Sequence, residues 1–126
     1  MDEIGYTEAI APVSSITPEH VDDHDVFPRL EQGGDVLVVI TSPFCGACTA
    51  MIRAIERLPQ GSVDRAFVAD AGESPGLVAD LEVFHLPALF LYRDGEFHRP
   101  IEVPPRVTEL VAALAEARSA PALDAP

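Results

Sequence analysis

Short apolar runs along the chain predict a set of β-strands. Residues 36–40, Val-Leu-Val-Val-Ile, form a continuous and mostly β-branched run, which is typical of a central strand buried on both faces of a sheet. Residues 66–69 and 88–92 are further apolar runs, and each predicts another strand. The run over residues 36–40 should therefore be a central strand, and the other two segments should be further strands.

A hairpin and a closing helix follow the last of these strands. Asp94-Gly95 is a hairpin signal, so residues 96–103 should run antiparallel to the strand before it. Pro100 lacks a backbone donor and places this last strand at an edge. Pro104-Pro105 then starts a helix, in which one face is apolar: Val107, Leu110, Val111 and Leu114.

Two more helices are predicted between the strands. From Cys45 onward, apolar residues recur at helical spacing and the opposite face carries Arg53, Glu56 and Arg57. The apolar face consists of Cys48, Met51, Ile52, Ile55 and Leu58. Ser74-Pro75 predicts a short helix that ends at about Leu81, with Ser74 as its cap.

The segment before residue 36 permits two interpretations. In the first, a helix begins at Thr17-Pro18 and Pro28 interrupts it. In the second, the chain stays extended to about Val21 and a helix begins near residues 23–25, which puts Pro28 closer to the first turn. Upstream, residues 10–16 could form a first strand.

The order of elements predicts an α/β fold with a mixed central β-sheet and helices on both faces. The chain has 126 residues, of which 48% are hydrophobic, enough for one domain with a packed core. We therefore predict a single domain over residues 1–126 with its core at about 10–119. Residues 1–9 should be a flexible lead-in, and residues 120–126 a flexible tail with nothing to bury.

Charge narrows the classes of partner. The formal net charge is −13, and all eight basic residues are arginine. Such a protein repels nucleic-acid backbones and anionic membrane surfaces, so we expect neither as a partner. No early apolar run follows basic residues, and no stretch is long and apolar enough to span a membrane. We therefore expect a cytoplasmic protein.

The two cysteines, Cys45 and Cys48, lie at the predicted strand-to-helix junction. A cysteine that opens a helix faces unpaired amides and the positive end of the helix dipole, which stabilise a thiolate. We therefore expect the pKa of Cys45 to fall below about 8.5, the value of a free thiol. Cys48 lies one turn later on the buried face, so Cys45 should attack and Cys48 should resolve the mixed disulfide.

A structural or metal-binding role for the cysteine pair has less support. A structural disulfide here would close a very small loop and would restrict the unfolded chain little. A zinc site needs four ligands, and the chain has no second pair of closely spaced cysteines. Two inert buried cysteines would seldom fall at a helix start. His20 and His24 would share a face on a helix, but we interpret them as part of a solvated acidic segment and expect no metal.

Together, the cysteine pair and the predicted elements around it make the sequence resemble the thioredoxin family over about residues 23–118. Phe44-Cys45-Gly46-Ala47-Cys48 stands where that family usually has Trp-Cys-Gly-Pro-Cys. Leu86-Pro87-Ala88, followed by a strand and Asp94-Gly95, resembles the family's Ile-Pro-Thr, strand and Asn-Gly turn. The resemblance implies a thioredoxin fold with Cys45 and Cys48 as the catalytic residues.

The resemblance also implies roles for the neighbours of the dithiol. Pro87 would be a cis proline packed beside it, and Leu86 would present its backbone to an extended substrate segment. Phe44 would join them as an apolar substrate contact. His85 lies two residues before Pro87 and should therefore lie near the rim, where it could contact a partner or, when protonated, favour the thiolate of Cys45; the alternative is a surface histidine without a role.

Some positions depart from the family pattern. Phe44 replaces the usual tryptophan and keeps an apolar cover. In the turn, Gly46 is kept, whereas Ala47 replaces the proline whose position tunes the redox potential in this family. Val39 stands where many members carry a buried aspartate that is thought to help deprotonate the resolving thiol. These differences indicate a thioredoxin-like relative rather than a general housekeeping thioredoxin.

We predict a thiol–disulfide oxidoreductase that reduces or exchanges disulfides in protein substrates and serves redox homeostasis and electron transport. It should need no cofactor, act as a monomer, and receive electrons from a reductase or glutathione. The alternatives are a thioredoxin-fold module that binds peptides or acts like a chaperone, and a redox sensor for one dedicated partner.

Overall fold

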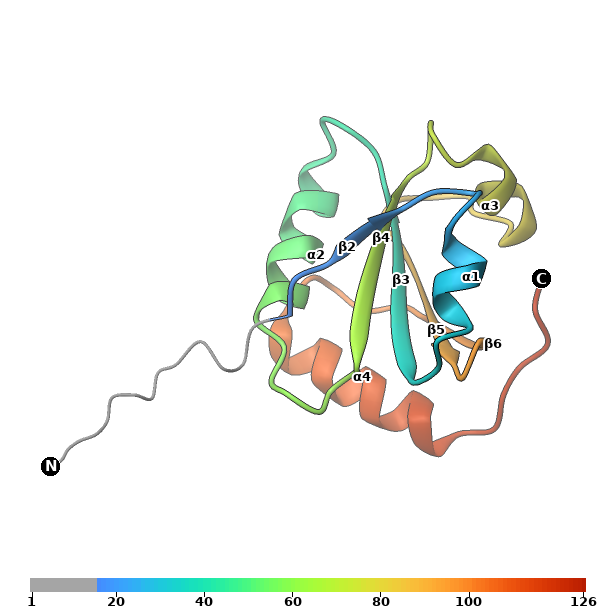
Figure 1. The fold of residues 1–126 in the computed structure, drawn as a ribbon. Helices are drawn as coiled ribbons and strands as arrows, with labels where there is room; N and C mark the ends of the chain where they lie inside the picture. Colours follow the sequence, from blue (N-terminus) through green and yellow to red (C-terminus); the bar gives the residue numbers. More distant parts are fainter. Residues whose placement is uncertain (1–15) are drawn as a thin grey trace, which may run out of the picture.

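The computed structural model describes residues 16–126. They form a five-stranded mixed sheet in the order β2-β4-β3-β5-β6 (Figure 1). The predicted lead-in over residues 1–9 lies outside the described residues, as does the predicted first strand over 10–16 except for Ile16. Ile16 belongs to no strand, and its amide donates to the carbonyl of Glu56 at 3.4 Å.

Strands and helices alternate along the chain up to the final hairpin. The strands are β2 (Glu19–Val21), β3 (Asp35–Thr41), β4 (Arg65–Asp70), β5 (Ala88–Arg93) and β6 (Glu96–Ile101). The helices are α1 (Val26–Leu30), α2 (Gly46–Glu56), α3 (Pro75–Asp80) and α4 (Val107–Ser119). β2, β4 and β3 are parallel to one another, whereas β5 is antiparallel to β3 and β6 is antiparallel to β5.

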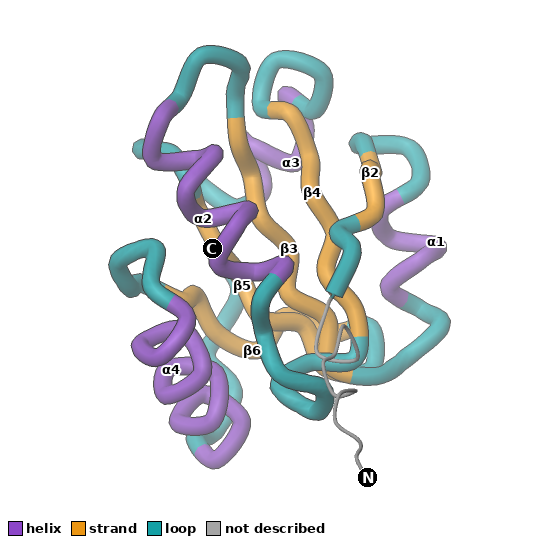
Figure 2. Tube along the Cα trace, turned by 90° about the vertical axis from the view of Figure 1, so that its left-hand side faces the viewer, coloured by secondary structure: helices purple, strands orange, loops and turns teal. Residues whose placement is uncertain are grey.

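β3 forms the centre of the sheet, as the apolar run over residues 36–40 predicts. Every residue of that run is fully buried. Leu37 and Val39 pack in a cluster with α2 and α4, and the other three pack in a second cluster with α1 and α3. The helices therefore cover both faces of the sheet (Figures 1 and 2), which confirms the predicted layers.

The second interpretation of the segment before β3 is the one that the structure confirms. The chain is extended over β2, turns, and begins α1 at Val26, so a helix starting at Thr17-Pro18 is wrong. Pro28 lies in the first turn of α1, where a missing amide costs little. In the turn, the amide of His24 and then that of Asp25 donate to the Asp22 carboxylate and hold the pKa of Asp22 below its usual value.

The cap of α3 differs from the prediction. Ser74 occupies the cap position, but its side chain makes no capping hydrogen bond. Its hydroxyl oxygen is buried and has no hydrogen-bond partner in residues 16–126. Instead, the carboxylate of Asp23 accepts from the amides of Gly76 at 2.8 Å and Leu77 at 2.7 Å. A residue distant in sequence thus supplies the cap, and it ties the turn after β2 to α3.

The final hairpin and helix follow the predicted order with shifted bounds. Asp94 and Gly95 both have positive φ, 52° and 88°, as a tight hairpin turn requires. β6 ends at Ile101 rather than at residue 103, and α4 begins at Val107, after an extended Arg106. β6 is an edge strand of the sheet and contains Pro100, as predicted.

The segment after α4 is attached to the edge of the sheet. Residues 121–126 are exposed. However, the amide of Leu123 donates to the His98 carbonyl at 2.8 Å, and Arg99 Nε donates to the Pro121 carbonyl at 2.8 Å. The tail thus runs beside β6 (Figure 1). Within the described part of the chain, every helix is too short or too polar to cross a bilayer.

We predict that Asp23→Ala lowers the free energy of unfolding by about 1–2 kcal/mol, because it removes both capping hydrogen bonds from α3. Ser74→Ala should change it by less than about 0.5 kcal/mol, since that hydroxyl has no hydrogen bond to lose. Urea unfolding followed by circular dichroism measures both variants. An equal or larger loss for Ser74→Ala would contradict the assignment of Asp23 as the cap.

Candidate active site

The two cysteines lie where the central strand passes into α2. After β3 the chain turns through Ser42 and Pro43, and Cys45 takes the N-cap position of α2 with an extended backbone. Cys45 and Cys48 form a disulfide with a Cα–Cα distance of 5.2 Å. Cys45 is half-buried, whereas Cys48 is only 3% exposed. The structure thus places Cys45 toward solvent and Cys48 toward the core, as the helical pattern predicts.

The first turn of α2 directs hydrogen bonds at Cys45. The amide of Cys48 donates to Cys45 Sγ at 3.1 Å, so the sulfur itself caps the helix. The amide of Thr49 donates to the Cys45 carbonyl at 3.1 Å, and its hydroxyl does so at 3.3 Å. An acceptor at this position gains from the helix dipole, and gains more when it carries a negative charge. The reduced form of Cys45 would therefore be stabilised as a thiolate.

Gly46 and Ala47 form the exposed beginning of α2. A Cβ added to Gly46 would have no atom within 4 Å, so packing does not demand glycine there. With no large side chain between the two cysteines, a second sulfur atom can approach the half-buried Cys45 from this side.

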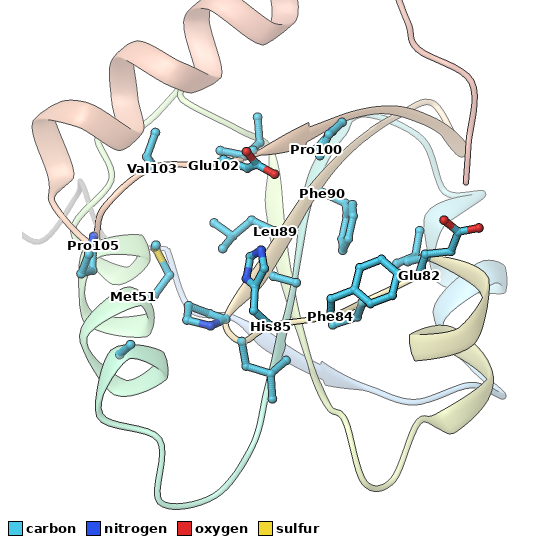
Figure 3. A pocket seen from close by; sticks show the side chains of 17 residues that line it. Met51, Glu82, Phe84, His85, Leu89, Phe90, Pro100, Glu102, Val103 and Pro105 are labelled. Atoms are coloured by element: carbon cyan, nitrogen blue, oxygen red, sulfur yellow. The ribbon is translucent and has the colours of Figure 1, made fainter.

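The loop before β5 forms the opposite wall of the site. The Leu86–Pro87 peptide bond is cis, as the resemblance implies. Leu86 and Pro87 are half-buried and His85 is exposed, and all three line a groove of about 410 Å³. Ala47, which lies between the two cysteines in the chain, lines the same groove. Figure 3 shows His85 of this loop in the groove together with Met51 of α2.

Phe44 lies apart from the other predicted substrate contacts. Its side chain is fully exposed, and it does not line the groove. Its φ is 61°, in a region that residues with a Cβ rarely adopt. The structure therefore places an aromatic ring in solvent just before Cys45, on a strained backbone.

The groove residues that sequence patterns did not assign to the site include Glu82, Phe84 and Glu102. Phe84 is 89% exposed, although nothing in its local pattern distinguishes it from a core residue. Glu102 directly follows β6, far along the chain, so only the fold brings it to this site.

The remaining polar candidates lie away from the disulfide or have local partners. His20 lies in β2 and His24 in the turn that follows, so they do not share a helix face. His98 is buried, and its ring bonds to the Ala117 carbonyl at 2.8 Å. Asp70, the last residue of β4, accepts from the amides of Gly72 at 2.8 Å and Glu73 at 3.1 Å. Residues 16–126 contain no cluster of three His, Cys, Asp or Glu side chains able to hold a metal.

Comparison with known proteins agrees with this geometry. The thioredoxin family model matches residues 19–116, which include the disulfide, the cis proline and the hairpin. The chain belongs to the thioredoxin family. Thioredoxin X of the chloroplast of Arabidopsis thaliana is 33% identical to this family member over 69 residues. That stretch covers 53% of this chain and 38% of the relative, so the chain matches well under half of the relative's length.

Solved thioredoxin structures share the fold of this family member. Thioredoxin f from spinach chloroplast, in its short form, superposes with a TM-score of 0.68 at 19% identity, covering 86% of this chain and 98% of its own. A mutant thioredoxin from Halobacterium salinarum also gives 0.68, at 20% identity, and covers 91% of this chain and 98% of its own. These similarities show the thioredoxin fold.

We predict that, after reduction, iodoacetamide modifies Cys45 at least about tenfold faster than Cys48, because Cys45 is more exposed and lies at the helix start. Peptide mass spectrometry after brief alkylation measures the ratio. Modification of both thiols at equal rates, or of Cys48 first, would contradict the assignment of Cys45 as the attacking thiol.

Phe44→Gly should raise the free energy of unfolding by about 1 kcal/mol, because glycine adopts positive φ without a steric penalty and the exposed ring loses no packing. Phe44→Ala is the matched control: it removes the ring but keeps the Cβ, so it should bring no such gain. Thermal unfolding of the three proteins measures this. A loss of stability in Phe44→Gly would mean that the ring makes stabilising contacts.

Proposed function

We propose that this protein is a thiol–disulfide oxidoreductase that acts on disulfides in proteins. The observation that carries the proposal is the disulfide at the N-terminus of α2, with Cys45 half-buried and Cys48 buried, beside a groove formed by the cis proline loop. Membership of the thioredoxin family supports it. The structure holds the oxidised form, so the reductive cycle begins when this disulfide has been reduced.

In the proposed cycle, the Cys45 thiolate attacks one sulfur of a substrate disulfide. The substrate S–S bond breaks, its other sulfur leaves as a thiolate that takes a proton from water, and a mixed disulfide forms at Cys45. Cys48, deprotonated by solvent, then attacks Cys45 Sγ and displaces the second substrate sulfur. The substrate has gained two electrons and two protons, and Cys45–Cys48 is oxidised again.

The loop before β5 supplies backbone groups for an extended substrate. Within the described residues, the amide and carbonyl of Leu86 make no hydrogen bond, so they can pair with a substrate strand. Pro87 has no amide to compete with that pairing. A substrate segment held at Leu86 would lie beside Ala47 and the disulfide, since they share the groove wall.

The partners follow from this chemistry. The substrates would be disulfide-containing proteins, and a flavoprotein reductase or glutathione would reduce Cys45–Cys48 by transfer of two electrons. A cytoplasmic location, a monomeric state and independence of cofactors stay predictions.

A peptide-binding module is a second candidate, favoured by the groove and by the exposed rings of Phe44 and Phe84. In such a module the dithiol would be secondary. Replacing both cysteines by serine separates the two functions: retained partner function would support the module, and lost processing of partner disulfides would support the oxidoreductase.

The test of the proposed function is the equilibrium between the Cys45–Cys48 disulfide and glutathione, read by thiol alkylation. A potential near about −270 mV would make the protein a reductant, and one between about −180 and −120 mV would make it an isomerase-like or oxidase-like protein. If no reversible disulfide forms at any glutathione ratio, the proposal fails.

Single variants test the roles of the two thiols. Cys48→Ser should accumulate a mixed disulfide with a protein substrate, because nothing displaces the substrate from Cys45. Cys45→Ser is the matched control and should trap none. Non-reducing electrophoresis shows the adduct, and trapping by Cys45→Ser alone would reverse the assigned roles.

A further inference from the structure

The groove beside the disulfide combines an apolar lining with two carboxylates. Most of its lining is hydrophobic and comes from α2, β5, β6 and the loop before β5. Glu82 and Glu102 are its charged residues, and no arginine lines it. Figure 3 shows Met51 at one end, Glu82 at the other and His85 between them, with Glu102 on the side formed by the end of β6.

Glu82 occupies a position that is locally unfavourable for it. It lies just after the C-cap of α3 and has a φ of 51°, where glycine is the usual residue because a Cβ is strained. Its carboxylate also lies at the negative end of the α3 dipole. Its side chain is exposed, so packing offers no compensation. A residue that is disfavoured by both backbone and charge points to a role outside folding.

Neither groove carboxylate is neutralised within the protein. In residues 16–126, Glu82 and Glu102 form no ion pair, and both are exposed. Arg106, which follows the groove residue Pro105, pairs with Glu109 instead. Other arginines pair elsewhere: Arg29 and Arg65 with Glu19, and Arg93 and Arg118 with Asp35. The groove that Ala47 lines therefore presents uncompensated negative charge, with Glu82 at the end away from α2.

We propose that this groove selects substrate segments that carry lysine or arginine near the disulfide, and that Glu82 and Glu102 are the residues that determine this specificity. The inference rests on the proposed oxidoreductase function and adds the class of substrate. The carboxylates bind and orient the substrate segment, and they exchange no atoms or electrons with it.

The shape of lysine and arginine side chains fits such a groove. Their aliphatic stems cover apolar surface while the charged head reaches a carboxylate at the rim. An acidic segment would be repelled both by the rim and by a protein with a net charge of −13. The same charge disfavours a second copy of this chain as the occupant. A basic segment of a disulfide-bearing protein is thus the occupant that matches both the lining and the rim.

The experiment uses the reduced full-length protein and three peptide disulfides. Each is a dimer of one short peptide joined through its cysteine, with flanking residues that are lysine, glutamine or glutamate. Cleavage of a dimer releases two peptide thiols and oxidises Cys45 and Cys48, and chromatography after alkylation measures the rate. Each rate is divided by the rate at which dithiothreitol cleaves the same dimer, which removes differences in intrinsic reactivity.

The wild type should cleave the lysine dimer about three- to tenfold faster than the glutamate dimer at low salt, since each rim charge contributes modestly. This preference should shrink at high salt because exposed charges are screened. Glu82→Gln/Glu102→Gln should lose most of it. The matched control is Glu56→Gln/Glu116→Gln, which removes the same charge at exposed positions outside the groove and should keep the preference.

The possible outcomes distinguish a failure of the proposed substrate specificity from a failure of the proposed oxidoreductase function. Equal normalised rates for all three dimers in the wild type would overturn the specificity and leave the oxidoreductase intact. Loss of the preference in both double variants would assign it to the overall charge and overturn the role of Glu82 and Glu102. Cleavage no faster than that by a Cys45→Ser/Cys48→Ser protein would overturn the proposed function itself.

Discussion

β3 is buried on both faces and paired with neighbours along both edges, and the position of the disulfide depends on it. Such a strand cannot slip by one residue without exchanging its two apolar clusters. Its last residue, Thr41, is also held by the amide of Ala71 at 2.8 Å. The turn that leads to Cys45 therefore starts from a fixed point, and α2, through buried Met51 and Ile55, fixes the other side.

Strand register brings the second half of the site to the first. β5 is antiparallel to β3, and Ile40 at the end of β3 pairs with Ala88 at the start of β5. The residues just before β5, Leu86 and Pro87, must therefore lie beside the turn that carries Cys45. The turn after β3 and the loop before β5 need no strong contact with each other, because the hydrogen-bonded pairing of β3 with β5 determines where both segments lie.

The elements that could be predicted from the sequence are those determined by residues close to one another along the chain. The buried run of β3, the helix after Cys45 and the Asp94-Gly95 hairpin depend on neighbouring residues, and all three were predictable. The cap of α3 was not, because Asp23 lies 53 positions from the amide of Gly76 and only tertiary structure joins them. For the same reason sequence patterns gave no sign of Glu82 and Glu102 in one groove. Ser74 does occupy the predicted cap position, but the Asp23 carboxylate is the stronger acceptor and takes the hydrogen bonds of the helix amides.

The tail beside β6 bears on how the protein behaves at high concentration. An edge strand offers unpaired backbone groups to other molecules and so invites the growth of intermolecular sheets. Here the His98 carbonyl already accepts from Leu123, Arg99 is engaged with Pro121, and Pro100 has no amide to offer. Residues 121–123 thus cover part of the β6 edge, and a truncation that ends with α4 would leave more of that edge available for intermolecular pairing.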